Sequence, residues 1–341
     1  MRVLVTGTDG YIGSLLGPAL LKRRFEVVGL DSGFYREGWL YNNGISRFPA
    51  CISKDIRHVS ESDLEGFDAV VHLAELSNDP LGQLSPAVTE EINHKGSVGF
   101  ALKCKKVGIR RFVYASSCSV YGVGSDDYKT EESAPNPQTA YAECKVKVER
   151  EVSSIADNDF SPTFLRNATA FGPSPRMRFD IVLNNLAGMA WTVREIKLTS
   201  NGTPWRPLVH VLDICDAVAS VLEAPGDVVH NQVFNVGDTA QNYRVRDIAE
   251  IVSKAFLGCP LTLGTDDKDN RSYRVSFEKI KSVLPGFRCQ RDAVTGAAQF
   301  RELFERIQMS PQLFQFRTFT RLKQIQHLIQ TGQVNQELFW S

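Results

Sequence analysis

Residues 2–13 read RVLVTGTDGYIG, a short β-branched and aliphatic run that leads directly into the glycines Gly7, Gly10 and Gly13. A helical pattern follows, so the glycines join a predicted strand to a predicted helix. In this setting the first glycine permits a sharp turn, the second lets the backbone approach a pyrophosphate, and the third allows helix and strand to pack closely. The stretch predicts a dinucleotide-binding turn, with phosphates at the positive end of the helix. The cofactor-binding residues expected here are Gly7, Asp9, Gly10, Tyr11, Ile12 and Gly13.

Asp31 is the acid that such a turn requires about 20 residues further on, at the end of the second predicted strand. A carboxylate at this place accepts hydrogen bonds from both adenosine ribose hydroxyls and repels a 2′-phosphate. The sequence therefore predicts NAD as cofactor in preference to NADP. Arg36 is close enough in sequence to weaken this preference if its loop folds back.

Strand and helix patterns alternate through the first half of the chain. The predicted strands span residues 2–6, 26–30, 69–73, 111–116 and 163–166, and the helices between them span 11–24, 86–107 and 139–156. Repeated strand–helix–strand units predict an α/β fold with a doubly wound parallel sheet of the Rossmann type.

The alternation becomes irregular after Gly172, where prolines interrupt it. We expect an NAD-binding domain over residues 1–172, with a return segment at 208–240, and a smaller, mostly helical substrate-binding region over 173–341. Within the latter, residues 179–191 and 245–256 have helical patterns. An aromatic-rich stretch at 313–319 and an amphipathic helix ending near Gly332 predict a packed C-terminal extension.

Composition narrows the function classes. The 341 residues include 39 Lys and Arg against 39 Asp and Glu, so the chain has no net charge to attract nucleic acid. The apolar runs are strand-sized and no signal-peptide pattern is present, which favours a cytoplasmic protein without membrane contact. The seven cysteines are odd in number and include no Cys-x-x-Cys pair, so we expect reduced thiols and no metal site.

Tyr141 and Lys145 stand four residues apart at the start of a predicted helix, on one face of it. The pKa of a tyrosine is ordinarily about 10, and a nearby cation favours the phenolate, so Tyr141 can act as a general base. Such pairs are also common on helix surfaces. Upstream, Ser116 and Ser117 end a central predicted strand, where hydroxyls point into the ligand crevice of a parallel sheet, or else satisfy their own turn.

These features together resemble the extended short-chain dehydrogenase/reductase family, in its group of NAD-dependent nucleotide-sugar epimerases and dehydratases. The resemblance covers nearly all of residues 1–280 and includes the glycine turn, Asp55-Ile56, His72-Leu73-Ala74, and the Tyr141/Lys145 pair. It implies catalytic roles for Ser117, Tyr141 and Lys145. Further cofactor contacts are implied for Asp55, Ile56, Leu73, Ala74, Ser116, Tyr141 and Lys145, and substrate contacts for Ser119, Thr169, Asn185, Arg206 and Arg271.

The chain departs from the family at several of these places. Dehydratases of the group carry an Asp-Glu pair where this chain has Cys118 and Ser119, and neither side chain readily replaces a carboxylate in eliminating water. A substrate-binding asparagine of the family falls on Thr169, and Glu75 stands where a small residue is usual. The segment 173–178 adds two arginines to the substrate side.

The sequence thus favours an NAD-dependent nucleotide-sugar epimerase, acting at C4 through a transient 4-keto sugar with Tyr141 as base. A 4,6-dehydratase, or a net oxidoreductase or reductase–epimerase on an activated sugar, is the alternative. A non-catalytic NAD-binding protein is a further alternative, which the set Ser117, Tyr141 and Lys145 disfavours. The resemblance also implies a homodimer formed through helices such as 86–107 and 139–156.

Overall fold

The computed structural model describes residues 1–42, 44–45, 47–77, 79–265 and 271–341. Its centre is a seven-stranded sheet in the order β11-β7-β5-β4-β1-β2-β3, with every neighbouring pair parallel. This confirms the Rossmann-type doubly wound sheet. The strands are β1 (Arg2–Thr6), β2 (Glu26–Asp31), β3 (Ala50–Ser53), β4 (Ala69–His72), β5 (Arg111–Ser117), β7 (Ser161–Asn167) and β11 (Gln232–Val236).

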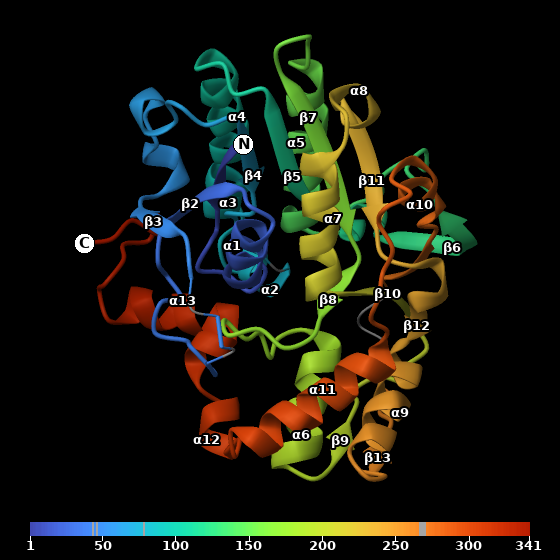
Figure 1. Cartoon of the computed structure of the whole chain (residues 1–341). Helices are drawn as coiled ribbons and strands as arrows, with labels where there is room; N and C mark the ends of the chain where they lie inside the picture. Colours follow the sequence, from blue (N-terminus) through green and yellow to red (C-terminus); the bar gives the residue numbers. More distant parts are fainter. Residues whose placement is uncertain (43, 46, 78, 266–270) are drawn as a thin grey trace.

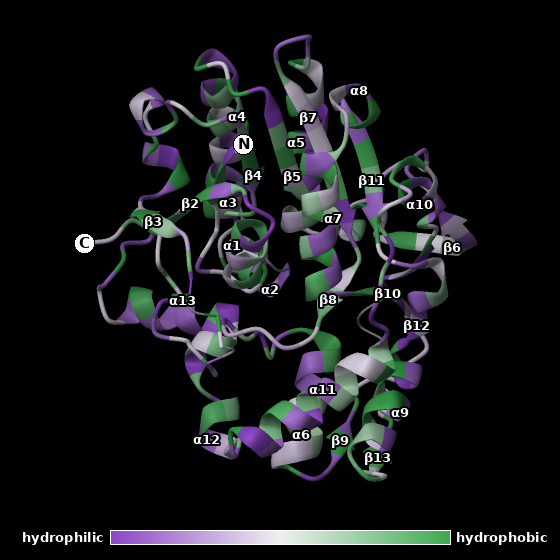
Figure 2. Ribbon diagram, in the orientation of Figure 1, coloured by the Kyte–Doolittle hydropathy of each residue, from purple (hydrophilic) through white to green (hydrophobic). Residues whose placement is uncertain are grey.

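Helices cover both faces of this sheet (Figure 1). On one face α1 (Gly13–Lys22) packs beside α7 (Val211–Glu223), and on the other α4 (Ser97–Lys106) packs beside α5 (Ala140–Ser154). The strands between them are buried because both faces are covered, and β11 is green along much of its length in Figure 2.

The predicted helix over 86–107 is divided into three parts: α3 (Pro86–Thr89), a π-helical segment η3 (Glu90–Gly96), and α4. In the wider π turn Asn93 is buried and faces Leu76. Its Oδ1 accepts from the Leu76 amide at 2.8 Å and its Nδ2 donates to the Leu76 carbonyl at 3.0 Å. The interrupted helix therefore fixes the chain that follows β4, at the edge where a Rossmann fold binds its ligand.

The second part of the molecule lies below the sheet in Figure 1. Three helices pack together there: α6 (Val182–Thr192), α9 (Val245–Ala255) and α11 (Ala293–Arg306). Small sheets that the sequence patterns did not predict join distant segments: β8 (Thr169–Phe171) with β10 (Trp205–His210) and β12 (Asn242–Arg244), β9 (Ile196–Lys197) with β13 (Leu261–Thr262), and β6 (Val123–Lys129) with β14 (Ser272–Val275). The short helices are α2 (Asp79–Leu84), α8 (Gly226–Val229) and α10 (Glu278–Val283).

The end of the chain returns to the seven-stranded sheet. It forms α12 (Pro311–Phe314), a short 3-10 turn η6 (Arg317–Phe319) and α13 (Arg321–Gln330), and it finishes beside β3 (Figure 1). There the Trp340 indole donates to the Ser32 carbonyl at 2.7 Å. The seven cysteines are free thiols. Within the described ranges, no helix combines the length and apolar character needed to cross a bilayer.

Candidate active site

The glycine turn joins β1 to α1 and has the tight form that the sequence predicts. Gly7 has φ +74°, in the left-handed region, and a Cβ there would press against the backbone of Leu73 and Ala74 at the end of β4. A Cβ on Gly13 would overlap the Gly7 carbonyl oxygen. The turn therefore depends on glycine and leaves bare backbone at the start of α1, where a diphosphate is accommodated.

Asp31, at the end of β2, lines the same pocket as the glycine turn. Its carboxylate is 8% exposed and accepts hydrogen bonds from the amides of Asp9, at 2.9 Å, and Gly33, at 2.7 Å. Burial is the main influence on this group and raises the pKa of Asp31 to about 6. The loop that carries Arg36 does fold back: the guanidinium donates to Ser53 at 2.8 Å and lies 3.4 Å from the Asp9 carboxylate.

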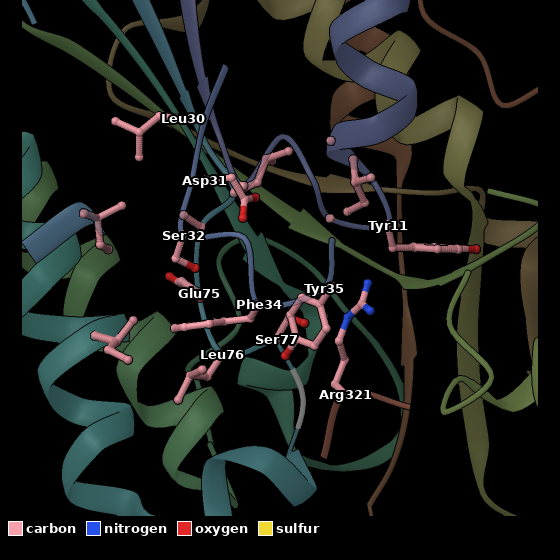
Figure 3. A pocket seen from close by; sticks show the side chains of 18 of the residues that line it. Tyr11, Leu30, Asp31, Ser32, Phe34, Tyr35, Glu75, Leu76, Ser77 and Arg321 are labelled. Atoms are coloured by element: carbon pink, nitrogen blue, oxygen red, sulfur yellow. The ribbon is translucent and has the colours of Figure 1, made fainter. Parts of the chain in front are cut away.

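Figure 3 shows this pocket, which continues from the glycine turn past Asp31 toward Glu75 and Arg321. Asp55 lines it and is held by Arg57, whose backbone amide, Nε and terminal nitrogen donate to the Asp55 carboxylate at 2.7–3.0 Å. The expected cofactor residues that line the pocket are Gly7, Gly10, Tyr11, Ile12, Gly13, Asp31, Asp55, Ile56, Leu73 and Ala74.

Tyr141 and Lys145 lie in the first turns of α5, which begins at an N-cap where the Thr139 hydroxyl accepts from the Ala142 amide. The Lys145 ammonium lies 5.4 Å from the centre of the Tyr141 ring and donates to the Ala115 carbonyl of β5. The structure thus brings the predicted phenol and ammonium together. Lys145 is buried and Tyr141 is half-buried at the carboxyl end of the sheet, beside the pocket.

Glu75, which follows β4, forms an ion pair with Lys145 at 2.5 Å, and the two side chains are 3% and 4% exposed. The Tyr114 hydroxyl donates to the same carboxylate at 2.5 Å. Burial raises the pKa of Tyr141 above its ordinary value; Lys145 opposes this shift, and Glu75 adds to it. The negative charge of Glu75 therefore opposes the effect of Lys145, which alone would lower the pKa of the Tyr141 phenol.

The serines at the end of β5 and in the turn after it have three different surroundings. The Ser117 Oγ accepts from the Ser119 amide at 3.1 Å and caps the turn η4 (Cys118–Tyr121). The Ser119 Oγ is buried without a hydrogen-bond partner among the described residues. Ser116 donates to Glu149. Cys118 is fully buried, and burial raises the pKa of its thiol well above its ordinary value, so it is not poised for proton transfer.

Of the residues expected to contact the substrate, some lie close together and others do not. Arg206 of β10 donates to the Arg271 carbonyl, and the Arg271 side chain pairs with Asp79. Asp79 in turn accepts from the Thr139 hydroxyl at 2.6 Å, which connects the arginines to the start of the Tyr141 helix. The Asn185 side-chain amide donates a hydrogen bond to the Phe179 carbonyl at 2.8 Å.

Thr169 is half-buried in β8 and pairs in register with Leu208, next to Ala170, which lines the pocket. Asn184, unlike Asn185, is buried, and sequence reasoning missed it. Its Oδ1 accepts from the Gly172 amide at 3.2 Å and its Nδ2 donates to the Tyr11 hydroxyl at 3.2 Å. Asn184 thereby joins the glycine turn to the second part of the molecule.

The two arginines of segment 173–178 make different contacts. Arg176 donates to the carbonyls of Tyr35, Arg36 and Gly38, and so it holds the loop after Asp31. Arg178 lines the pocket and pairs with Asp180 at 2.9 Å. Its place beside the pocket follows from the fold of residues 173–181 and has no signal in local spacing.

The comparisons with known proteins agree with this geometry. The model of the NAD dependent epimerase/dehydratase family matches residues 3–237. The chain belongs to this family. A UDP-glucose 4-epimerase of Bacillus subtilis (strain 168) is 28% identical over 289 residues, which are 74% of this chain and 82% of that protein.

Two solved structures extend this family likeness to the fold. MoeE5, solved in complex with UDP-glucuronic acid and NAD, has 25% identity and a TM-score of 0.78, over 90% of this chain and 99% of that one. DesIV, a dTDP-glucose 4,6-dehydratase from Streptomyces venezuelae, has 24% identity and a TM-score of 0.78, over 90% and 97%. The second likeness concerns the fold alone.

NAD is the cofactor of this family, and the pocket fits it. The turn at Gly7 and Gly13 leaves the backbone accessible to a diphosphate. The buried Asp31 carboxylate lines the same pocket and can accept hydrogen bonds from ribose hydroxyls. Asp55 and Ile56, which were expected to contact the cofactor, line the same pocket. The chain is therefore an NAD-dependent enzyme of the epimerase/dehydratase family.

Proposed function

We propose that the protein is a nucleotide-sugar 4-epimerase with Tyr141 as its acid–base group. The observation that carries this proposal is the placement of Tyr141 and Lys145 together beside the NAD pocket, with Cys118 and Ser119 in place of a carboxylate pair. The likeness to UDP-glucose 4-epimerases supports the same reaction.

Each chain residue has a defined task in this reaction. The glycine turn and Asp31 would hold NAD, which would supply the hydride acceptor and donor for C4 of the sugar. Tyr141 removes the proton of the C4 hydroxyl and gives it back after the 4-keto sugar has turned over. Lys145 stabilises the phenolate, and Ser117 orients the hydroxyl. Burial of Lys145 limits the access of water to the exchanged proton.

The substrate's nucleotide and sugar have candidate partners outside the cofactor pocket. The Ser119 hydroxyl is buried and unpartnered among the described residues, so a substrate hydroxyl would find a free donor and acceptor there. Arg206 and Arg271, which lie side by side, suit the diphosphate of a nucleotide sugar through their planar guanidinium groups.

The test is the interconversion of C4 epimers by the purified protein, followed by NMR with UDP-, dTDP- and GDP-hexoses. The Tyr141→Phe variant should bind NAD like the wild type and lose turnover by about 10²-fold or more, because it keeps the ring and lacks the titrating hydroxyl. Tyr128→Phe, on an exposed strand, is the matched control and should retain activity. Near-wild-type epimerisation by Tyr141→Phe would remove Tyr141 from the mechanism. Light scattering on the same preparation tests the expected homodimer.

A further inference from the structure

The last residues of the chain, 311–341, lie beyond the part that the family describes and pack on the rim of the cofactor pocket. We call them the C-terminal segment. The Gln324 amide donates to the Phe34 carbonyl at 2.9 Å, and the Trp340 indole donates to the Ser32 carbonyl. Both acceptors lie within three residues after Asp31. The segment is therefore fixed against the loop that shapes the ribose end of the pocket.

A second set of contacts ties the C-terminal segment to the adenine side. The Arg57 guanidinium lies 3.7 Å from the centre of the Phe339 ring, and it donates to the Glu337 carbonyl at 2.8 Å. The same guanidinium holds the Asp55 carboxylate. The segment thus contacts the pocket wall at two separate places, and one of these contacts, from Gln324, is made by α13 itself.

Arg321 is the first residue of α13, and its side chain lines the pocket together with the glycine turn (Figure 3). It is 2% exposed, its guanidinium lies 4.0 Å from the centre of the Tyr35 ring, and it donates to the Thr318 carbonyl at 3.2 Å. Among the residues that the structure describes, no carboxylate lies within ion-pair distance of this guanidinium. Asp180, the nearby acid, pairs with Arg178 and accepts from the Arg321 backbone amide at 3.3 Å.

This position is unfavourable for a cation unless an anion joins it. A buried charge without a partner is costly, and burial accordingly lowers the pKa of Arg321 to about 10. The positive end of the α13 dipole also disfavours a cation in the first turn. The Arg321 side chain therefore does not stabilise α13.

We propose that Arg321 binds the diphosphate of NAD, so that the C-terminal segment supplies a cofactor-binding residue from outside the family's common chain. A guanidinium presents two parallel N–H donors to phosphate oxygens, and a buried one binds an anion more strongly than an exposed one. The pocket that Arg321 lines is bounded by Gly7, Gly10 and Gly13, which form the diphosphate turn, and by Asp31.

The test measures binding, by calorimetry, of adenosine, AMP, ADP, UDP and NAD to the 341-residue protein. Arg321→Gln should leave adenosine affinity unchanged and reduce the gain in affinity from adenosine to ADP by about 10- to 100-fold, the value of a charge-assisted contact. NAD affinity should fall by a similar factor. Arg317→Gln is the matched control, because Arg317 belongs to the same segment but pairs with Glu37 away from the pocket.

Three outcomes would overturn the proposal. An equal loss for adenosine and ADP would make Arg321 a structural residue. A loss confined to UDP, with ADP unaffected, would assign it to the diphosphate of the substrate. No loss for any ligand would remove it from binding altogether. If Arg321→Gln does not fold, Arg321→Lys keeps the charge without the planar fork and should show a smaller loss, again only for ligands with phosphate.

Discussion

Lowering the pH from 7 to 5 should weaken NAD binding, because the Asp31 carboxyl takes up a proton in this range. The group is buried, and burial raises its pKa to about 6. NAD requires the ionised form, since a carboxylate accepts from both ribose hydroxyls while a protonated carboxyl donates one of its own hydrogens. Affinity is therefore complete above this pKa and declines as the pH falls through it.

The size of the effect follows from the fraction of Asp31 that is ionised. With a pKa of about 6, this fraction is about 0.9 at pH 7 and about 0.1 at pH 5, so the dissociation constant should rise about tenfold. Calorimetric titration with NAD, in buffers of constant ionic strength, measures this directly.

Two variants make this prediction specific. Asp31→Asn should bind NAD weakly at both pH values and lose the dependence. Asp159→Asn is the matched control, because Asp159 is exposed and lies before β7, which three strands of the sheet separate from β2. An unchanged wild-type affinity between pH 7 and 5, or an undiminished pH dependence in Asp31→Asn, would refute the assignment of Asp31 to the ribose.

Two further predictions concern buried ion pairs. The Glu75 carboxylate opposes Lys145 and so raises the pKa of Tyr141. Glu75→Gln removes this carboxylate, so the rising limb of the pH–rate profile should move to lower pH. An unmoved limb would show that Glu75 does not influence the pKa of Tyr141. In the wild type the Glu149 carboxylate accepts three hydrogen bonds from the buried Arg166 guanidinium, at 2.7–3.1 Å. Glu149→Gln leaves this cation without its carboxylate and should lower the free energy of unfolding by about 3–5 kcal/mol. Urea denaturation measures this loss, and a change below about 1 kcal/mol would contradict it.

The fold was predictable where burial imposes a pattern on neighbouring residues. β1, β4 and β5 are covered on both faces, so each appears in the sequence as a continuous apolar run. β3 lies at the edge of the sheet and is largely exposed, and its residues therefore have no such run. The small sheet of β8, β10 and β12 depends on pairing between distant segments, which local patterns do not contain.

The same limit applies to the candidate site. The glycine turn and the Tyr141/Lys145 pair have fixed spacings, because each belongs to one turn or one helix face. Glu75 meets Lys145 only because β4 and β5 are adjacent in the sheet, and 70 residues separate the two in sequence. Arg321 reaches the pocket because the C-terminal segment returns to β2, and nothing in the spacing of its neighbours indicates this.

The central claim, that hydride leaves and returns at C4 without elimination, is tested most directly by turnover in deuterium oxide. The nucleotide sugar that the enzyme converts should give a product of unchanged mass, without deuterium on carbon, because no C–H proton exchanges with solvent. A dehydratase removes the C5 proton and loses water. Deuterium at C5, or a product lighter by one water, would contradict the epimerase and would direct attention to Glu75 as the carboxylate that eliminates.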